Sequence, residues 1–402
     1  QADGGGVELR PEHVPLAVEM VPDVWEPQTL GDLERKGQVR LGRGQVISQV
    51  DINEFPGDYP IYSSSIHDDG LFGRYARYLF DEELITWSID GGGNFFYRPK
   101  HRFSVTNVCG YMRINTTTID YRFLAYQLQL LHEAKTYDYQ MKAHPSVIRW
   151  AYTVALPRID EQERIAAALS DVDALISSLD KLIAKKRDIK QAAMQQLLTG
   201  KRRLPGFCGE WVSRRIGDIS DSSSGGTPLS SVSAYYGGSI PWVSISDMTS
   251  SGKYLVMTER SLTDEGLAAS AAKVFPAGTV LYAMYASIGE CSIAAIELCS
   301  SQAILGIRPR ESCDGHYLYY WLVSKKDEVI AMGQHGTQAN LNADMVKDFR
   351  VPLPTIDEQR AIANVLSDMD AEIEALERRR DKTRLLKQGM MQELLTGRVR
   401  LV

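Results

Sequence analysis

The sequence has few cysteines, and none is placed for a disulfide framework or a metal site. Five occur in 402 residues, no two of them form a CxxC pair, and the seven histidines are scattered. An odd number of isolated cysteines predicts buried free thiols in a reducing, cytoplasmic compartment. We therefore expect neither disulfides nor a bound metal.

Long apolar runs and the motifs of nucleotide-dependent enzymes are also missing. No apolar stretch approaches the roughly 20 residues of a membrane span, and nothing resembles a signal peptide. There is no GxxxxGK[ST] loop, and Asp90-Gly-Gly-Gly-Asn94 lacks the GxGxxG spacing, so we interpret it as a turn between strands. There is also no Pro-Pro dipeptide, which adenine methyltransferases use to hold a flipped base. These absences predict no catalysis, no cofactor and no small-molecule substrate.

Positive charge is not in excess. The net charge is −6, whereas proteins that bind DNA through phosphates alone need surplus Lys and Arg. The charge is uneven: residues 1–155 carry −5, residues 156–203 carry +3, residues 204–352 carry −4, and residues 353–402 are neutral. Any DNA binding must therefore depend on local basic loops or on a partner.

What the sequence does contain is a long internal repeat. Residues 156–200 and 353–397 align without a gap, and 25 of 45 positions are identical. Each copy follows a globular stretch, and the stretches begin alike, with Trp25 and Trp211 each followed by a hydrophobic-Gly-Asp triplet. The chain is therefore two modules in tandem. We predict an extension at 1–20, a first globular domain at 21–155 with a helix at 156–203, and a second at 204–352 with a helix at 353–402.

The globular stretches are predicted to be mixed α and β. Short β-branched or aromatic segments bounded by Gly, Asp or Pro are typical of strands. Helices are expected at 122–133 and 316–329. The predicted strands are 59–62, 83–87, 94–97 and 103–106 in the first module, and 240–244, 279–283 and 303–307 in the second.

The repeated segments are predicted to be long helices that pair as a coiled coil. Each follows a proline, with Asp160 or Asp357 as the expected N-cap and Gly200 or Gly397 as the expected left-handed residue after the end. Apolar residues spaced alternately by four and three indicate a narrow heptad seam. Because domain termini usually lie close together, the helices should run antiparallel in a pseudo-two-fold arrangement, each about 60 Å long. The predicted seam residues are Ile165, Leu169, Val172, Ile176, Leu179, Ile183, Ile362, Leu366, Met369, Ile373 and Leu376.

These motifs resemble a known family. The LPxIDEQxxIAxxLSDxD start and the LLTG end of each helix are similar to the specificity subunit of type I restriction–modification systems, and the resemblance covers nearly the whole chain from about residue 21. It implies two target-recognition domains, each reading one half of a bipartite, asymmetric DNA site, with the helices as a spacer. It also implies a non-catalytic scaffold for methyltransferase subunits, two in number, and restriction subunits, which would hold any S-adenosylmethionine and ATP.

In the second module, a loop at 333–342 resembles the G(T/S)xQxxLN-like loop of these recognition domains. Gln and Asn side chains suit adenine, and Thr suits phosphate. Hydroxyl-rich segments at 222–228 and 242–248 resemble early loops of the family. The alternatives are an Asn turn in a solvent loop, ordinary turn chemistry, and a solvated lysine. The candidate DNA contacts of this module are Ser223, Thr227, Ser244, Ser246, Lys253, Gln334, Thr337, Gln338 and Asn340.

The first module departs from that pattern, because 139–146 lacks the Gly and the Asn. Its hydroxyl-rich counterpart is 59–65, followed by 70–74. The candidate DNA contacts here are Ser63, Ser64, Ser65, Arg74, Arg98, Lys100, Lys142 and His144. For the arginines and the lysine, a solvated surface charge is the alternative. The basic clusters 185–187 and 378–380 on the helices could face DNA, with a solvated helix face as the alternative.

Two other functions remain open. A coiled-coil scaffold without DNA specificity would suit the acidic charge but not two divergent domains on matched frames. A self-contained DNA methyltransferase is disfavoured by the missing motifs.

Overall fold

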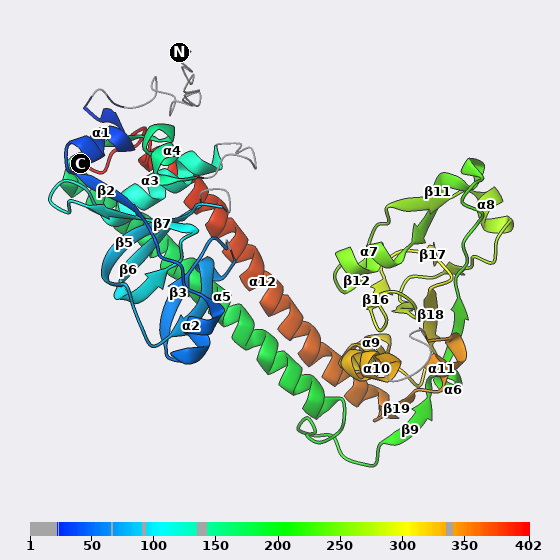
Figure 1. Cartoon of the computed structure of the whole chain (residues 1–402). Coiled ribbons are helices and arrows are strands. Elements are labelled where there is room, and N and C mark those ends of the chain that lie inside the picture. The colour runs from blue at the N-terminus through cyan, green and yellow to red at the C-terminus, as the bar shows by residue number, and fades with distance from the viewer. Residues whose placement is uncertain (1–21, 23, 66, 91–93, 135–142, 335–340) are drawn as a thin grey trace. The chain divides into compact units, whose positions relative to one another are not determined.

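The computed structural model describes residues 22, 24–65, 67–90, 94–134, 143–334 and 341–402. The chain forms two compact units (Figure 1). Unit 1 consists of Gln1–Asp180 and Arg378–Val402, and unit 2 of Lys181–Glu377. Each unit therefore contains one globular domain and half of each long helix. The extension predicted at residues 1–20 lies outside the described ranges.

The domain of unit 1 is built on a six-stranded sheet. Its strand order is β2-β7-β5-β6-β3-β4, and β5 and β6 form its longest antiparallel pair. The strands are β2 (Val39–Arg43), β3 (Tyr59–Tyr62), β4 (Leu71–Tyr75), β5 (Phe80–Ser88), β6 (Phe95–Val105) and β7 (Cys109–Ile114). The helices are α1 (Leu30–Arg35), α2 (Gln49–Glu54), α3 (Tyr121–Glu133) and α4 (Pro145–Ala151), with a 3₁₀ turn η2 (His67–Gly70).

The core of this domain lies between the sheet and α3. Trp87 is fully buried and donates a hydrogen bond from Nε1 to the Ala143 carbonyl at 2.7 Å. A Cβ at Gly110 would lie 2.1 Å from the Trp87 ring, so only glycine lets β7 pass this close to the indole. Phe95 and Leu128 pack into the same cluster.

The domain of unit 2 has two smaller sheets, ordered β10-β18-β15-β16-β12 and β13-β11-β17-β14. The first comprises β10 (Ser220–Ser224), β12 (Tyr254–Leu255), β15 (Val280–Ala283), β16 (Cys291–Ala294) and β18 (Ile304–Pro309). The second comprises β11 (Tyr236–Val243), β13 (Arg260–Leu262), β14 (Val274–Phe275) and β17 (Leu298–Ser300). The helices are α6 (Ile216–Ile219), α7 (Ile245–Ser250), α8 (Asp264–Ala268), α9 (Gly315–Ser324), α10 (Lys326–Gln334) and α11 (Ala343–Lys347), with a 3₁₀ turn η3 (Ser233–Tyr235).

Both domains are closed in the same way despite these different sheets. In unit 1 the first strand, β1 (Glu26–Thr29), pairs antiparallel with the last, β8 (Thr153–Leu156). In unit 2, β9 (Val212–Arg215) pairs antiparallel with β19 (Arg350–Leu353). The chain thus enters and leaves each domain at one place and continues directly into a long helix, which is the pattern that the internal repeat predicts.

The short elements match the sequence expectations with two corrections. The two strands expected at 94–97 and 103–106 are parts of the single strand β6, because its partner β5 is long enough to pair with both. The helix expected at 316–329 is two helices, since α9 ends at Ser324 and α10 begins at Lys326. The Asp90–Asn94 segment connects β5 to β6, although residues 91–93 lie outside the described ranges.

The long helices are α5 (Ile159–Leu197) and α12 (Ile356–Leu394), each 39 residues. Gly200 and Gly397 have φ of 69° and 72°, which confirms the expected left-handed positions. The expected N-caps are wrong: Asp160 and Asp357 lie inside the first turn, because α5 already begins at Ile159 and α12 at Ile356.

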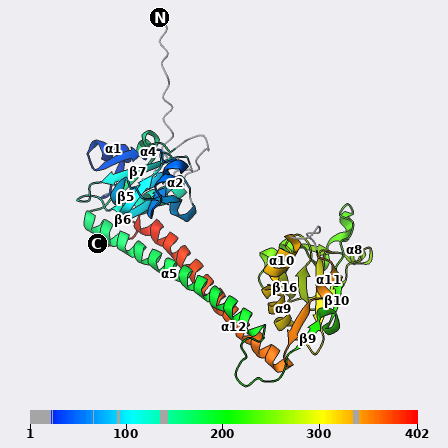
Figure 2. The same ribbon diagram turned by 60° about the horizontal axis from the view of Figure 1, so that its bottom comes forward.

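Each unit by itself shows that the two helices pack antiparallel (Figures 1 and 2). In unit 1, Ile165 and Leu169 near the start of α5 pack with Leu394 near the end of α12. In unit 2, Leu197 near the end of α5 packs with Ile362 near the start of α12. Among the predicted seam residues, Ile165, Leu169, Leu179, Ile183, Ile362, Leu366 and Ile373 are buried, and Val172, Ile176, Met369 and Leu376 are half-buried.

Candidate nucleic-acid interface

The three serines predicted in unit 1 mainly hold the turn that follows β3. Thr106 donates a hydrogen bond to Ser63 Oγ at 2.9 Å, and the Ser64 carbonyl accepts one from Ser88 at 2.9 Å. Ser65 is exposed, and its hydroxyl accepts a 3.1 Å hydrogen bond from the backbone N of His67. Ser65 is thus the serine of this group whose side chain is most accessible to a ligand.

Arg98 does not lie where we expected it. Its side chain is buried, with 5% exposure, and Nε donates to Thr86 Oγ1 at 3.0 Å while Nη2 donates to the Asp69 carbonyl. The guanidinium lies 3.7 Å from the centroid of the Tyr62 ring, and burial lowers its pKa. The prediction of Arg98 as a surface cation that contacts DNA is therefore wrong in its premise. It is an interior arginine that connects β6 to the turn before β4.

Arg74 and Lys100 are exposed, as expected of surface cations. Arg74 donates from Nη1 to the Asp58 carbonyl at 2.8 Å. Lys100 lies in β6 between Arg98 and His101, where the register with β5 shifts, and its side chain is exposed.

The structure adds two arginines that the sequence analysis missed. Arg102 donates to the Tyr59 hydroxyl at 3.1 Å and lies 5.0 Å from the centroid of Tyr78, while Arg77 lies 3.4 Å above the Phe55 ring. Hydrogen bonds to Tyr59 and Asp81 raise the pKa of Arg102. We call Tyr59, Arg74, Arg77, Tyr78 and Arg102 the cationic–aromatic patch. Interleaved Arg and Tyr at 74–78 and 97–102 was the sequence signal that could have identified it.

Of the two candidates near α4, His144 and Lys142, only His144 lies within the described residues. His144 is the N-cap of α4: its Nδ1 accepts from the backbone N of Ser146 at 3.4 Å and lies 2.9 Å from Ser146 Oγ. Its side chain is exposed, so capping leaves its other ring nitrogen accessible. Lys142 lies outside the described residues.

In unit 2, Ser223 lies on β10 beside a shallow hollow of about 240 Å³. Lys273 and Arg308 also line it, both exposed, and neither was singled out from the sequence. Thr227 is exposed just beyond β10. Two cations and two hydroxyls from β10 can hold phosphate oxygens, and Asp221 at the edge is paired with Arg310 at 2.7 Å.

Ser244 and Ser246 belong to the start of α7. Ser244 is the N-cap in a capping box: its hydroxyl donates to Asp247 Oδ2 at 2.6 Å, and Ser246 Oγ lies 2.8 Å from Ser244 Oγ. Ordinary turn chemistry accounts for these contacts.

Lys253 does not face solvent as a DNA-contacting cation would. It is half-buried, and Nζ donates to the Tyr320 hydroxyl and to Ser367 Oγ, each at 2.9 Å. Burial lowers the pKa of this lysine. Lys253 thus contacts α9 and α12, and its contact with DNA stays a prediction.

The Gln- and Asn-containing loop falls largely outside the described residues, which exclude Thr337, Gln338 and Asn340. Gln334 is the last residue of α10. Asn342, which follows the loop, is the N-cap of α11 and accepts from the backbone N of Met345 at 2.9 Å. Asn342 therefore has a structural role, as in the Asn turn that was the alternative to a DNA contact for this loop.

The Asp-Glu-Gln start of each repeat has a structural role that the sequence did not disclose. In unit 1, Glu161 is buried and receives two hydrogen bonds from Arg400, both at 2.6 Å, and Arg400 lies 5.6 Å from the centroid of Trp25. Gln162 donates to the Thr118 and Pro157 carbonyls and accepts from the backbone N of Asp120, the N-cap of α3. The last residues of the chain and the domain are thus joined to the start of α5.

Unit 2 repeats this arrangement. Arg203 donates to buried Glu358 at 2.5 and 2.6 Å and lies 5.6 Å from the centroid of Trp211. Gln359 donates to the Ser312 and Pro354 carbonyls and accepts from the backbone N of Asp314, the N-cap of α9. The repeated motif therefore specifies how each domain is attached to the helices.

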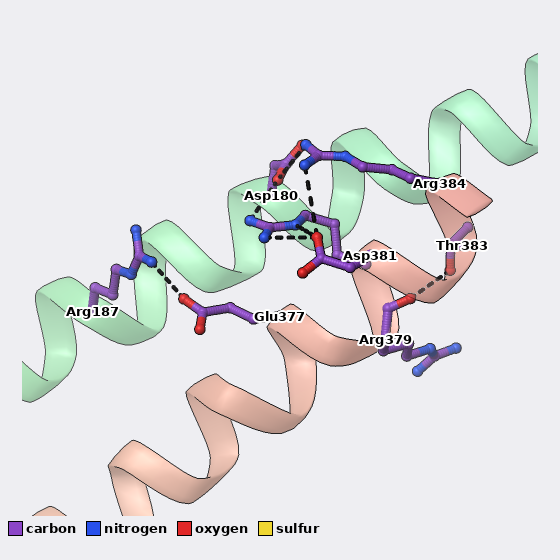
Figure 3. Close-up of polar contacts among 8 residues, drawn as sticks. Asp180, Arg187, Glu377, Arg379, Asp381, Thr383 and Arg384 are labelled. Atoms are coloured by element: carbon purple, nitrogen blue, oxygen red, sulfur yellow. Dashed lines mark hydrogen bonds and ion pairs between the residues drawn. The ribbon is translucent and has the colours of Figure 1, made fainter. Parts of the chain in front are cut away.

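The basic clusters on the helices form ion pairs between the helices (Figure 3). Within unit 1, Asp180 contacts Arg380 at 3.5 Å and Arg384 at 3.1 Å. Within unit 2, Arg187 contacts Glu377 at 2.5 Å and Lys186 contacts Glu372 at 2.7 Å. These pairs join α5 to α12, so Lys186, Arg187 and Arg380 contribute to helix pairing.

Within the described ranges, no helix is both long enough and apolar enough to cross a membrane. No group of three or more His, Cys, Asp or Glu side chains gathers there in a way that could hold a metal ion.

We call the buried pairs Glu161–Arg400 and Glu358–Arg203 the joints between the domains and the helices. Two dissimilar α/β domains that are attached through equivalent joints to copies of one repeated helix define a two-module protein. Residues 22–186 and 209–383 each match the family described as type I restriction modification DNA specificity domain. The two matches together cover most of the chain, and the chain belongs to this family. It is a specificity subunit with two target-recognition domains, a class that is non-catalytic because the enzymatic activity of these systems lies in other subunits.

Similar proteins agree with this assignment. The type I restriction enzyme MjaVIII specificity subunit of Methanocaldococcus jannaschii is 24% identical over 409 residues, covering 94% of each chain. The MjaIX specificity subunit of the same organism is 31% identical over 168 residues, but that match spans 41% of this chain and only 39% of the relative. The crystal structure of the S subunit from M. genitalium shares the fold, with a TM-score of 0.61 at 14% identity, over 93% of this chain and 96% of the other.

Proposed function

We propose that each recognition domain reads one half of a bipartite, asymmetric DNA site and that the paired helices set the unread gap. The observation that carries this is the contrast between the joints and the domains. The joints at Glu161 and Glu358 have the same contacts, whereas the domains have sheets of different size and strand order. A shared frame that carries two different domains suits two different half-sites at a fixed spacing.

We further propose the domain bounds 21–155 and 204–352 for recognition and 156–203 and 353–402 for the spacer, with 1–20 as an extension. In unit 1 the cationic–aromatic patch and Lys100 are the favoured contacts, because exposed arginines beside aromatic rings suit phosphates and unstacked bases. In unit 2 the favoured contacts are Ser223, Thr227, Lys273 and Arg308. Ser65, His144 and Ser246 remain candidates, as do Lys142, Gln334, Thr337, Gln338 and Asn340.

Family membership implies double-stranded DNA and methyltransferase and restriction subunits as partners. We propose two methyltransferase subunits, because the two joints and the two helix halves are repeated. S-adenosylmethionine and ATP belong to these partners, and the cytoplasm is the proposed compartment. The acidic balance of the chain means that the isolated subunit should bind DNA weakly and the complex with methyltransferase tightly.

The experiment that tests this proposal is mapping of methylated positions in DNA treated with the reconstituted methyltransferase complex. A single bipartite motif with unlike halves and a fixed gap is expected. Exchanging residues 204–352 for the second domain of another specificity subunit should change one half only. A continuous or symmetric motif would refute the proposal.

A coiled-coil scaffold without DNA specificity is the alternative. A salt titration with and without the methyltransferase separates the two. The specificity subunit should show sequence-selective binding with a steep salt dependence in the presence of its partner, whereas a scaffold shows no selective binding at any salt concentration.

A further inference from the structure

The same arrangement of tyrosine, serine, aspartate and lysine occurs once in each unit. In unit 1, the Tyr126 hydroxyl of α3 donates to Asp173 Oδ2 of α5 at 2.7 Å and lies 3.3 Å from Ser170 Oγ. Lys387 of α12 contacts Asp173 at 2.8 Å and lies 5.0 Å from the centroid of the Tyr126 ring. One domain helix and both long helices therefore meet at a single ion pair, which we call junction 1.

Junction 2 has the same members with the two long helices exchanged. The Tyr320 hydroxyl of α9 donates to Asp370 Oδ2 of α12 at 2.5 Å and lies 3.1 Å from Ser367 Oγ. Lys190 of α5 pairs with Asp370 and lies 5.6 Å from the centroid of the Tyr320 ring. Both ion-paired side chains are only 21% exposed. Lys253 adds a second cation to this junction through its bonds to Tyr320 and Ser367.

The repeat accounts for the residues on the long helices but not for the tyrosines. Asp173 and Asp370 stand at equivalent positions of the repeat, and so do their serine and lysine partners. Tyr126 and Tyr320 come from domains with different sheets, yet each is the sixth residue after the N-cap aspartate of its helix, Asp120 or Asp314. Two unlike domains thus place the same hydroxyl at the same point.

Each domain helix makes polar contacts at two places, in addition to its apolar packing against the long helices. Its N-cap is bonded to Gln162 or Gln359, and its middle is bonded to the junction six residues further on. Because apolar packing is not directional, the two polar contacts, about 9 Å apart along the helix, are what fix its direction along the long helices. Because the tyrosine hydroxyls bond to a carboxylate in partly buried surroundings, each bond contributes more than an exposed pair would.

We propose that Tyr126 and Tyr320 are positioning residues that fix the tilt of each recognition domain on the long helices and thereby determine which gap between half-sites is accepted. The inference rests on the proposed function above. Successive base pairs are about 3.4 Å apart along DNA. A tilt that moves the DNA-facing surface of a domain by a few ångströms can therefore bring it to a half-site one base pair nearer or farther. A firmly held domain excludes those sites.

The test uses the reconstituted methyltransferase complex and a DNA library in which the gap varies by single base pairs between intact half-sites. Tyr126→Phe and Tyr320→Phe should raise methylation at gaps one base pair off by about tenfold relative to the matched gap, with both half-site sequences unchanged; tenfold corresponds to about 1.4 kcal/mol. Tyr317→Phe is the matched control, because Tyr317 lies on the same helix as Tyr320 but bonds to the Pro352 carbonyl at 2.6 Å within its own domain.

A charge exchange separates positioning from mere stability. Asp173→Asn should relax the gap, and the double variant Asp173→Lys with Lys387→Asp should regain the ion pair between α5 and α12, and with it stability, but keep the relaxed gap, because a lysine at position 173 cannot accept the hydrogen bond of the Tyr126 hydroxyl. Unchanged gap selectivity in all junction variants, or a changed half-site sequence, would overturn the inference and leave the proposed function intact. Absence of any bipartite motif for the wild type would instead contradict the proposed function itself.

Discussion

The joint between Glu161 and Arg400 should be a main source of stability in unit 1. Glu161 is buried with 3% exposure, and both of its carboxylate oxygens accept from the guanidinium of Arg400 at 2.6 Å. Arg400→Met keeps the aliphatic contact near Trp25 but leaves the carboxylate buried and unpaired. Truncating one partner of a fully buried pair costs about 3–5 kcal/mol, and because Arg400 is partly exposed we expect about 2 kcal/mol here.

The tail offers a matched control two residues away. Arg398 pairs with Glu393, but both side chains are about 40% exposed, so Arg398→Met should cost less than about 1 kcal/mol. Denaturant unfolding followed by tryptophan fluorescence measures both variants, since Trp25 lies 5.6 Å from Arg400. Glu161→Gln and the double variant complete a thermodynamic cycle, in which the double variant should be less destabilised than the sum of the single variants.

Equal costs for Arg400→Met and Arg398→Met, or simple additivity of Arg400→Met and Glu161→Gln, would contradict this role of the Glu161–Arg400 pair. Either result would mean that the repeated Glu is solvated in the folded chain and that the tail is not anchored at the start of α5. Removal of residues 400–402 should cost more than Arg400→Met, because it also removes Leu401, which packs against the core of unit 1 and accepts a hydrogen bond from Arg164.

Four further predictions concern DNA readout, accessibility and pH. Removing one heptad from both α5 and α12 should change the gap of the methylated motif before either half-site; altered half-sites with the gap retained would contradict the ruler role of the helices. Arg102→Ala should weaken binding of the complex to the first half-site and reduce the salt slope by about 1, as loss of one phosphate contact requires, while Arg98→Ala should instead lower stability. A thiol reagent should label only Cys208 in the native chain, because Cys208 is exposed and the other four thiols are buried. Burial also raises the pKa of Cys109 and Cys313 to about 12. Rapid labelling of a second cysteine would contradict this. Hydrogen bonds from Thr29 lower the pKa of Asp32 in the folded chain. The carboxylate therefore stabilises the fold above its pKa in the unfolded chain, and this contribution is lost as the pH falls through its pKa in the folded chain. The urea midpoint of Asp32→Asn should consequently change less with acidic pH than that of the wild type.

The repeat made the long helices and the tandem organisation readable from the sequence, because identical spacing of apolar residues predicts the same helix wherever it occurs. The strands of the domains were partly readable as well: 59–62 was predicted at the bounds of β3. Misplaced features had specific causes. The length of β6 follows from its pairing with β5, and the burial of Arg98 goes with its contacts to Thr86 and Tyr62, neither of which leaves a local pattern.

Candidate DNA contacts were harder to identify, because residue type does not reveal which side chain a cation meets in space. Lys253 and Arg98 are of residue types that often contact DNA, but in the fold Lys253 bonds to the Tyr320 hydroxyl and Arg98 lies over the Tyr62 ring. Arg77 and Arg102 were overlooked because the rings beside them lie far away in the sequence: Phe55 for Arg77, and Tyr59 and Tyr78 for Arg102.

The sequence by itself determined that this chain is two modules built on one repeated helix, since duplication and heptad spacing are local properties of the chain. The tertiary structure decided what the repeated polar residues do. Glu161 contacts an arginine 239 positions away, and Asp173 brings together helices from three parts of the chain. Contacts between residues so distant in sequence depend on packing, and packing has no counterpart in the spacing of residues along the chain.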